Sequence, residues 1–209
     1  MIKQNLPLIN HIKVISFDLD NALYDNGPVL AKAEAASAKY LSETFASQGH
    51  LFRISEFEAL RAELSLSKAI ELENMTHLRL KALLAVCQPL ANAIFVAEQA
   101  LAIFLEARSK ALLEPEIEQL IAELAANFIL VTVSNGNCDP QKLTIGHFFK
   151  RHYCPELGYR AKPNREMLQQ VLQDFDVQPQ QLLHVGDSLT KDGEAAKMAG
   201  AHFFHFAPF

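Results

Sequence analysis

The chain has 209 residues, half of them hydrophobic, and a formal net charge of −5. This length suits one domain, or a domain with an insert, and the composition excludes a disordered chain. The negative charge gives no electrostatic reason to expect nucleic acid or an anionic membrane as a partner.

The cysteines and the apolar segments bear on the compartment. Cys87, Cys138 and Cys154 have no paired spacing, which is typical of a reducing compartment and of thiols that simply pack. The first 13 residues lack the continuous apolar core of a signal peptide. The most apolar region, residues 82–107, is interrupted by a proline and by polar and charged residues, so it indicates buried helices rather than a bilayer span. We therefore expect a soluble, cytoplasmic protein.

Short apolar runs rich in β-forming residues predict five strands, and helical patterns separate the later ones. Pro115, Asp139-Pro140 and Pro163 read as helix starts, Thr190 as the cap of a last helix, and Gly200 as its end. This alternation favours a parallel α/β sheet. The predicted strands are residues 12–17, 128–133, 152–155, 182–185 and 202–206.

Between the first two strands, residues 26–110 contain no convincing strand. They read as four helical segments, and both ends of the block attach to the same sheet. The sequence thus predicts a core formed by residues 1–25 and 111–209, with an all-helical domain inserted at 26–110. The four predicted helices are residues 28–47, 55–65, 67–86 and 89–107.

Polar side chains follow three of the predicted strands. The first strand ends in two carboxylates, Asp18 and Asp20. Residues i and i+2 of a strand point to the same face, so these two side chains are expected on one side. Ligands of parallel sheets bind beyond the carboxyl ends of the strands, so we expect the polar residues to meet at one edge. The remaining residues expected there are Ser134 and Asn135 after the second strand, Asp187 and Asp192 after the fourth, and Lys162 before Pro163.

This set of side chains suits phosphoryl transfer. Mg²⁺ prefers hard oxygen ligands such as the carboxylates of Asp18 and Asp187. A carboxylate can also attack phosphorus, while Ser134, Lys162 and backbone amides near Asn135 are donors for the phosphoryl oxygens.

A second carboxyl group must protonate the leaving oxygen and then activate water, and Asp20 is placed for this. Asp174-Phe175-Asp176 repeats the Asp-x-Asp spacing at the end of an amphipathic helix, where it reads as a solvated turn. The spacing alone is therefore weak evidence, and each site residue taken singly has an ordinary structural interpretation. The combination carries the hypothesis.

Four motifs in order give the chain a resemblance to the haloacid dehalogenase-like hydrolases: FDLD (17–20), VTVSNG (131–136), Lys162 with Pro163, and GDSLTKD (186–192). The resemblance implies a Rossmann-like parallel sheet of order 5-4-1-2-3 with a helical cap inserted after the first motif. It also implies these roles: Asp18 as nucleophile, Asp20 as acid/base, Ser134 and Lys162 (with Asn135) as phosphate-binding residues, and Mg²⁺ held by Asp18, the Asp20 carbonyl and Asp187, with Asp192 in support.

A narrower likeness rests on FDLDNALYDNGPV, SNGN, KP and LLHVGDSLTKD. These stretches are similar to the pyrimidine phosphatases, including those that act on 5-amino-6-(5-phospho-D-ribitylamino)uracil. The likeness implies a small phosphorylated metabolite as the partner, such as a phosphorylated pyrimidine, FMN or a nucleotide. The family usually has Thr or Val where this chain has Ala22.

Several alternatives stay open at this point. A sugar-phosphate phosphatase or a phosphomutase would use the same residues. A dehalogenase of this family does not use an acid at the position of Asp20, which favours phosphoryl chemistry. A receiver-type regulatory module lacks a helical insert of this size. A degenerate binding scaffold of the same fold is the non-enzymatic alternative, and the sequence leaves the oligomeric state open.

Overall fold

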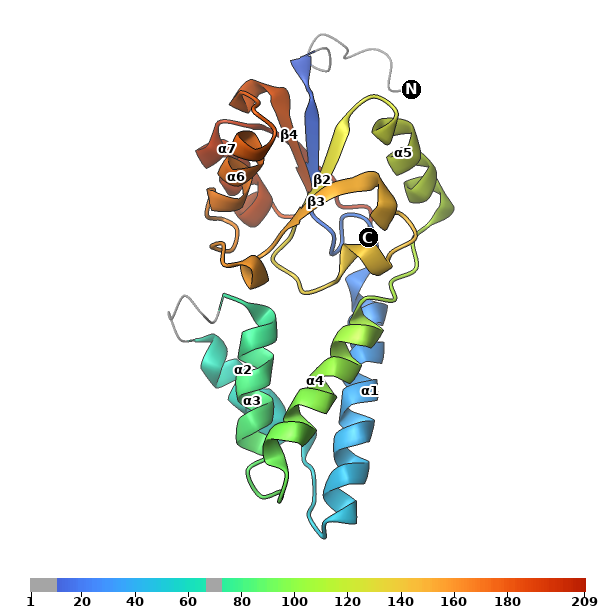
Figure 1. Cartoon of the computed structure of the whole chain (residues 1–209), viewed down its shortest axis with the longest axis vertical. Helices are drawn as coiled ribbons and strands as arrows, with labels where there is room; N and C mark the ends of the chain where they lie inside the picture. The colour runs from blue at the N-terminus through green and yellow to red at the C-terminus, as the bar shows by residue number, and fades with distance from the viewer. Residues whose placement is uncertain (1–10, 67–72) are drawn as a thin grey trace. The chain divides into compact units, whose positions relative to one another are not determined.

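The computed structural model describes residues 11–66 and 73–209, which form two compact units (Figure 1). The expectation about a signal peptide falls largely on residues 1–10, and the start of the helix predicted at 67–86 falls on residues 67–72, all outside the described residues. The sheet unit comprises the chain up to Asp25, Leu112–Gly136 and Pro140–Phe209, and the helical unit comprises Asn26–Ala111 and Asn137–Asp139.

In the described part of the sheet unit, five strands form one sheet, all parallel, in the order β3-β2-β1-β4-β5. This confirms the predicted fold class and the predicted order 5-4-1-2-3. The chain enters the sheet at its centre, because β1 pairs with β2 on one side and with β4 on the other. The strands are β1 (Val14–Phe17), β2 (Ile129–Val133), β3 (Phe149–Tyr153), β4 (Leu182–Gly186) and β5 (His202–His205).

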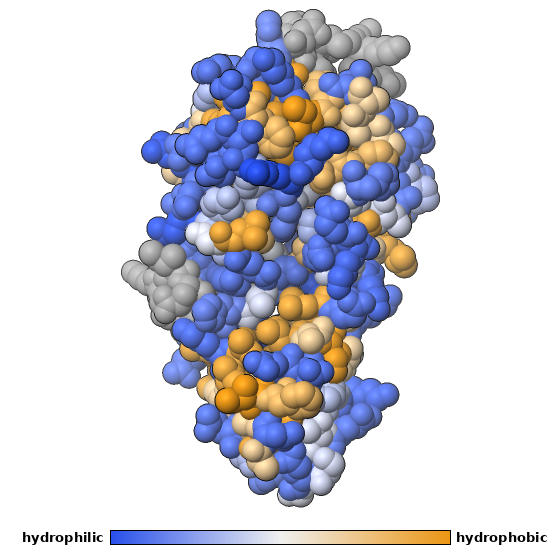
Figure 2. Space-filling view, viewed as in Figure 1, coloured by the Kyte–Doolittle hydropathy of each residue, from blue (hydrophilic) through white to orange (hydrophobic). Residues whose placement is uncertain are grey.

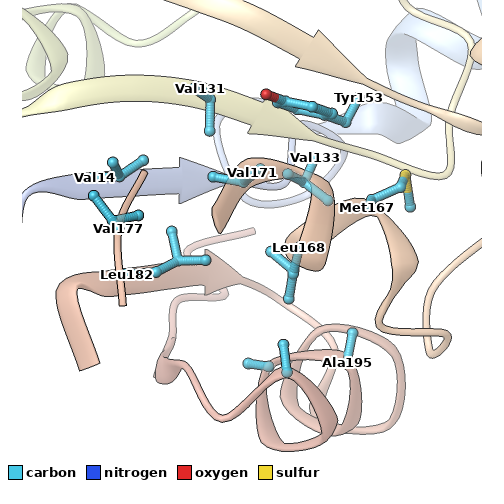
Figure 3. Packing of buried hydrophobic residues seen from close by; sticks show 12 residues of the cluster. Val14, Val131, Val133, Tyr153, Met167, Leu168, Val171, Val177, Leu182 and Ala195 are labelled. Carbon is cyan, nitrogen blue, oxygen red and sulfur yellow. The ribbon is translucent and has the colours of Figure 1, made fainter. Parts of the chain in front are cut away.

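Helices cover both faces of this sheet. Helix α5 (Pro115–Ala125) lies on one face, while α6 (Glu166–Asp174) and α7 (Glu194–Ala199) lie on the other (Figure 1). All four residues of β1 are buried, as expected for a central strand that is covered on both sides. Figure 3 shows side chains from β1, β2, β4, α6 and α7 packed into one hydrophobic cluster. This core fixes the strand ends that carry the polar residues.

Some predicted boundaries were wrong. Strand β3 begins at Phe149 instead of residue 152, because Lys150 and Arg151 point to solvent on an edge strand and mask the apolar pattern. Helix α6 begins only at Glu166, after a turn that contains Pro163. Five further short helical turns follow β2 in the unit: Pro140–Lys142, Gly146–Phe148, Pro155–Leu157, Pro179–Gln181 and the π-helical turn Leu189–Gly193.

The helical unit has its own hydrophobic core, formed by side chains from all four of its helices. No strand occurs among its described residues. Along the part of the chain that is described, no helix is both long and apolar enough to cross a bilayer. On the face drawn in Figure 2, hydrophobic surface patches alternate with hydrophilic residues. The helices are α1 (Asn26–Ser47), α2 (Ile54–Ser65), α3 (Met75–Val86) and α4 (Ala93–Arg108).

Candidate active site

Asp18 directly follows the central strand β1 and is only 7% exposed. Its backbone N–H donates to the carbonyl of Val185 at 2.8 Å, so the ladder between β1 and β4 continues to this residue. Its carboxylate accepts a hydrogen bond from Nζ of Lys162 at 2.9 Å. The strand geometry therefore holds a buried carboxylate at the carboxyl edge of the sheet, against a single ammonium group.

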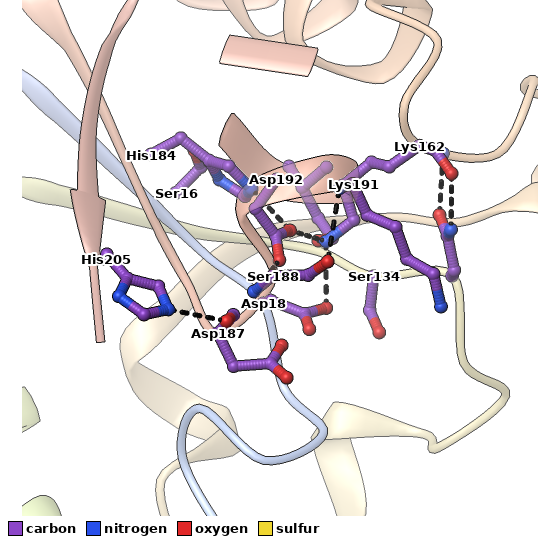
Figure 4. Close-up of polar contacts among 12 residues, drawn as sticks. Ser16, Asp18, Ser134, Lys162, His184, Asp187, Ser188, Lys191, Asp192 and His205 are labelled. Atoms are coloured by element: carbon purple, nitrogen blue, oxygen red, sulfur yellow. Dashed lines mark hydrogen bonds and ion pairs between the residues drawn. The ribbon is translucent and has the colours of Figure 1, made fainter. Parts of the chain in front are cut away.

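Lys162 links three segments of the site (Figure 4). Its Nζ also donates to the carbonyl of Val133 at 2.6 Å and to Oδ1 of Asp192 at 2.5 Å. The side chain of Asn135 fixes the backbone of Lys162 by accepting from its N–H at 2.7 Å and donating to its carbonyl at 2.8 Å. Lys162 is 4% exposed, so it is no surface lysine.

Asp192 is buried and accepts several hydrogen bonds besides the one from Lys162. Its Oδ1 accepts from Nε2 of His184 at 3.0 Å, and its Oδ2 accepts from the backbone N–H of Ser188 at 3.0 Å. Because a carboxylate only accepts, Nε2 of His184 carries the proton, and Nδ1 accepts from the Ser16 hydroxyl at 2.9 Å. With its oxygens occupied in this way, Asp192 holds neighbouring groups in place.

Burial and charge shift the pKa values of these groups. Burial, together with the charge of Asp192, raises the pKa of Asp18 to about 6, although Lys162 opposes the shift. Burial would lower the pKa of Lys162, but the charges of Asp18 and Asp192 raise it. Burial would likewise raise the pKa of Asp192, which the His184 hydrogen bond and the Lys162 charge instead hold well below its ordinary value. Burial lowers the pKa of His184 and keeps it neutral.

Asp20 lies in a tight loop that doubles back on itself. Asn21 has a positive φ of 61°, a conformation that asparagine tolerates better than most residues. Its N–H donates to the carbonyl of Tyr24 at 2.9 Å, and the Tyr24 hydroxyl donates to Oδ1 of Asp20 at 2.6 Å. A Cβ atom on Gly136 would lie only 3.3 Å from Cγ of Asp20 and 3.4 Å from Oγ of Ser134. Glycine therefore leaves room for both side chains.

Three carboxylates could hold a metal ion. One oxygen from each of Asp18, Asp187 and Asp192 lies within 4.8 Å of the other two. Asp187 is the most accessible of the three, and the ring of His205 donates to its carbonyl at 2.7 Å. Oxygen ligands of this kind fit Mg²⁺. The raised pKa of Asp18 also fits a cation, because Lys162 alone does not offset the burial and the nearby charges.

The structure thus brings the predicted residues to one edge of the sheet unit. Lys162 contacts Asp18, Asp192 and Asn135 directly, Asp187 completes the carboxylate cluster, and Asp20 and Ser134 flank Gly136. Asp174 has a different role, because it accepts a hydrogen bond from Tyr153 at 2.7 Å and forms an ion pair with Arg151. The sequence-based interpretation missed four supporting residues: Ser16, Tyr24, His184 and His205.

One of these residues had a recognisable signal. His184 falls at a buried position of a central strand, where an imidazole needs polar partners on both ring nitrogens. The register of β1 and β4 places Ser16 opposite His184, but the sequence does not predict that register.

Comparisons with known proteins identify the family and the fold. The chain is 26% identical over 199 residues to the 5-amino-6-(5-phospho-D-ribitylamino)uracil phosphatase YigB of Escherichia coli (strain K12), a match that covers 92% of this chain and 82% of that protein. It superimposes with a TM-score of 0.86 on the crystal structure of a 2-haloacid dehalogenase from Pseudomonas syringae pv. Tomato DC3000, at 26% identity, covering 94% of this chain and 87% of the other.

A more distant structural relative shows the fold alone. The putative hydrolase YfnB from Bacillus subtilis, solved with bound magnesium, matches with a TM-score of 0.58 at 20% identity, covering 92% of this chain and 87% of that one. The family model for haloacid dehalogenase-like hydrolases matches residues 12–200. With the strand order and the four motifs in place, the chain belongs to the haloacid dehalogenase-like hydrolases.

Proposed function

We propose that this hydrolase is a Mg²⁺-dependent phosphatase that acts on a small phosphomonoester through an aspartyl-phosphate intermediate. The observation that carries the proposal is the environment of Asp18. Its buried carboxylate follows the central strand, contacts Lys162 at 2.9 Å and belongs to a cluster with Asp187 and Asp192. A nucleophile for phosphorus needs an ionised oxygen, nearby positive charge and a site from which bulk water is excluded.

The roles follow from chemistry. An oxygen of Asp18 attacks phosphorus, the bond to the leaving oxygen breaks, and that oxygen takes its proton from Asp20. Asp20 then accepts a proton from water, whose oxygen attacks the phosphoryl group and releases Asp18. The net reaction converts the monoester and water into an alcohol and inorganic phosphate. Ser134, Lys162 and the amides near Asn135 bind the phosphoryl oxygens.

Mg²⁺ would be held by Asp18, Asp187 and the carbonyl of Asp20, with Asp192 supporting the site. When bound, it supplies positive charge that offsets charge on the phosphoryl oxygens. A cation suits this place, because the carboxylates of Asp18 and Asp192 share the ammonium of Lys162, and Asp187 adds a third carboxylate to the cluster.

For the substrate, we propose a phosphorylated pyrimidine, FMN or a similar nucleotide, in line with the named activity of YigB. The polar residues at the sheet edge recognise phosphate and metal, so selection of the leaving group falls to other residues. The helical insert 26–110, which enters the chain directly after the loop of Asp20, is proposed as that selective cap domain. The proposal extends to a location in the cytoplasm.

The test is release of phosphate by the purified protein from a panel of phosphorylated metabolites, with Mg²⁺ and with excess chelator. We expect turnover only with the metal, and kcat/KM at least about tenfold higher for one nucleotide-like or pyrimidine compound than for an aryl phosphate, about 1.4 kcal/mol of transition-state binding. Asp18→Asn should abolish turnover. Full activity in chelator would contradict the role of Mg²⁺. A preference for sugar phosphates would exclude a phosphorylated pyrimidine as the substrate and leave the phosphatase function in place.

Asp176→Asn is a matched control for Asp18→Asn. Asp176 belongs to the second Asp-x-Asp, is exposed, and has a φ of 48° that asparagine also adopts. It should keep full activity.

Dehalogenation is the second candidate, because a relative of equal identity is named a 2-haloacid dehalogenase. The carboxyl group of Asp20 favours phosphatase chemistry, since a dehalogenase has no leaving oxygen to protonate. Halide release from a 2-haloacid by the purified protein, without phosphate release from any monoester, would reverse this preference.

A further inference from the structure

The carboxyl group of Asp20 is held by a buried tyrosine. The Tyr24 hydroxyl donates to Oδ1 at 2.6 Å, at the short end of the ordinary range for a hydrogen bond between two oxygens. Tyr24 is 1% exposed, and its backbone carbonyl accepts from Asn21, so the loop itself fixes the position of the ring. A hydroxyl fixed in this way restrains the carboxyl group at one of its two oxygens.

The second oxygen of Asp20 faces a different group. A Cβ atom on Gly136 would meet Oδ2 first, and Oγ of Ser134 would be 3.4 Å from the same point. Ser134 in turn accepts from the N–H of Gly136 at 3.1 Å, which orients its hydroxyl oxygen. Oδ2 therefore points toward the loop that is proposed to bind phosphate, and Oδ1 points toward Tyr24.

We propose that Tyr24 is a positioning residue that aims Oδ2 of Asp20 at the leaving oxygen. This inference rests on the proposed function of Asp20 as general acid. During cleavage Oδ2 gives its proton to the leaving oxygen as the bond to phosphorus breaks, and the electron pair of that bond stays with the oxygen. The Tyr24 hydroxyl keeps its own proton and stabilises the charge that forms on the Asp20 carboxylate.

Packing alone does not require this hydroxyl. Phenylalanine would fill the same buried volume, whereas the tyrosine hydroxyl needs an acceptor when it is taken out of water. The neighbouring residue, Ala22, is buried and has no hydroxyl to offer Asp20. The hydrogen bond from Tyr24 is the observed restraint on Oδ1.

Tyr24→Phe tests the proposal with two substrates of similar size. The leaving group of 4-nitrobenzyl phosphate is an alkoxide that needs a proton, whereas 4-nitrophenyl phosphate releases a stable phenolate. We expect kcat/KM to fall about tenfold for the benzyl ester and less than about threefold for the phenyl ester, because general-acid catalysis helps only the first. Equal losses for the two esters, or no loss, would overturn the proposal.

Two further variants separate positioning from general destabilisation. Tyr153→Phe removes another buried hydroxyl of the same unit, one that donates to Asp174 at 2.7 Å, and should not discriminate between the two esters. In an Asp20→Asn background, Tyr24→Phe should have no further effect on the benzyl ester, since the residue acts through Asp20. A full tenfold loss in that background would contradict the inference.

Crystal structures of the wild type and of Tyr24→Phe give a readout that needs no activity. The carboxyl group of Asp20 should turn away from Gly136 in the variant and keep its orientation in Tyr153→Phe. If it turns while neither ester is hydrolysed by the wild type, the positioning role stands and the proposed phosphatase function fails. If it keeps its orientation in Tyr24→Phe, the positioning role fails regardless of activity.

Discussion

At the scale of single residues, the buried charge of Asp192 depends on its neighbours. His184→Leu removes one hydrogen bond from a buried carboxylate, so we expect the free energy of unfolding to fall by about 2–3 kcal/mol. Ser16→Ala is the matched control: it removes a bond between two neutral groups and should cost no more than about 1.5 kcal/mol. Chemical denaturation of the three proteins provides the comparison. Equal losses would mean that the His184 bond contributes nothing specific to Asp192.

Ala22 poses a second question at this scale. Because it is 0% exposed, Ala22→Thr must displace neighbouring atoms, and we expect a loss of about 1–2 kcal/mol in stability. Phosphate release should change by less than about threefold, since Asp20 already accepts a hydrogen bond from Tyr24. Ala22→Ser adds the hydroxyl with less volume and serves as the control. A severalfold gain in turnover with either variant would show that the Tyr24 bond is not sufficient.

At the scale of elements, the end of β4 and the turn after it form one structural unit around Asp192. A Cβ atom on Gly186 would lie 2.6 Å from Oδ2 and 2.8 Å from Cβ of Asp192, so the strand can end here only in glycine. Gly186→Ala should displace the carboxylate, lowering stability by about 1–3 kcal/mol together with turnover. Thermal unfolding and phosphate release measure both effects.

Gly193→Ala is the control for this element. Gly193 has helical dihedral angles, and the nearest atom to an added Cβ is a ring carbon of Phe203 at 3.2 Å, which can move. Its effect on stability should stay below about 1 kcal/mol, because alanine also favours the helical conformation. If Gly186→Ala and Gly193→Ala lose stability and turnover to the same extent, the close approach of Asp192 is not the reason for glycine at position 186.

At the scale of the whole molecule, each unit has its own core and should lose stability separately. In the helical unit, the carboxylate of Glu34 accepts from Arg61 at 2.5 Å and from both terminal nitrogens of Arg79, whose guanidinium lies 3.4 Å from the ring centroid of Phe104. Arg79 is 4% exposed, so its charge depends on this pairing. Glu34→Gln should destabilise the helical unit by about 2 kcal/mol.

Hydrogen exchange localises this effect. Amides of the helical unit should lose protection in Glu34→Gln while those of β1 and β2 keep theirs. Glu43→Gln removes an exposed ion pair with Lys39 at 4.0 Å. It should change the free energy of exchange protection in the helical unit by no more than about 0.5 kcal/mol. Lost protection throughout the sheet would contradict separate cores.

The pH dependence of this ion pair has a defined sign. Burial would raise the pKa of Glu34, but the hydrogen bonds and charges of Arg79 and Arg61 lower it below its ordinary value of 4.5. The contribution of the carboxylate is therefore present above that value and is lost as the pH falls through the lowered pKa. The stability difference between wild type and Glu34→Gln should shrink at acidic pH.

The sequence by itself determined the strands of the sheet, their order through the family motifs, and the acidic residues at the strand ends. Periodicity and turn residues are local signals, and parallel strands bring their carboxyl ends to one edge whatever the details of packing. The sequence predicted the ends of the elements less well. Thr190 was expected to cap the last helical segment, but the cap is Ser188, whose side chain accepts from the N–H of Lys191. Both residues suit a cap, and only the backbone path selects one.

Only the tertiary structure decided which groups support the site. The hydrogen bond between Ser16 and His184 joins residues far apart in the chain, and it exists because β1 and β4 pair in one register. The bond from Tyr24 to Asp20 spans four residues, yet it depends on a loop that doubles back through a positive φ at Asn21. A hydrogen bond requires a donor–acceptor distance within a few tenths of an ångström and a suitable angle. Strand register and loop conformation set both, whereas the spacing of residues in the sequence does not.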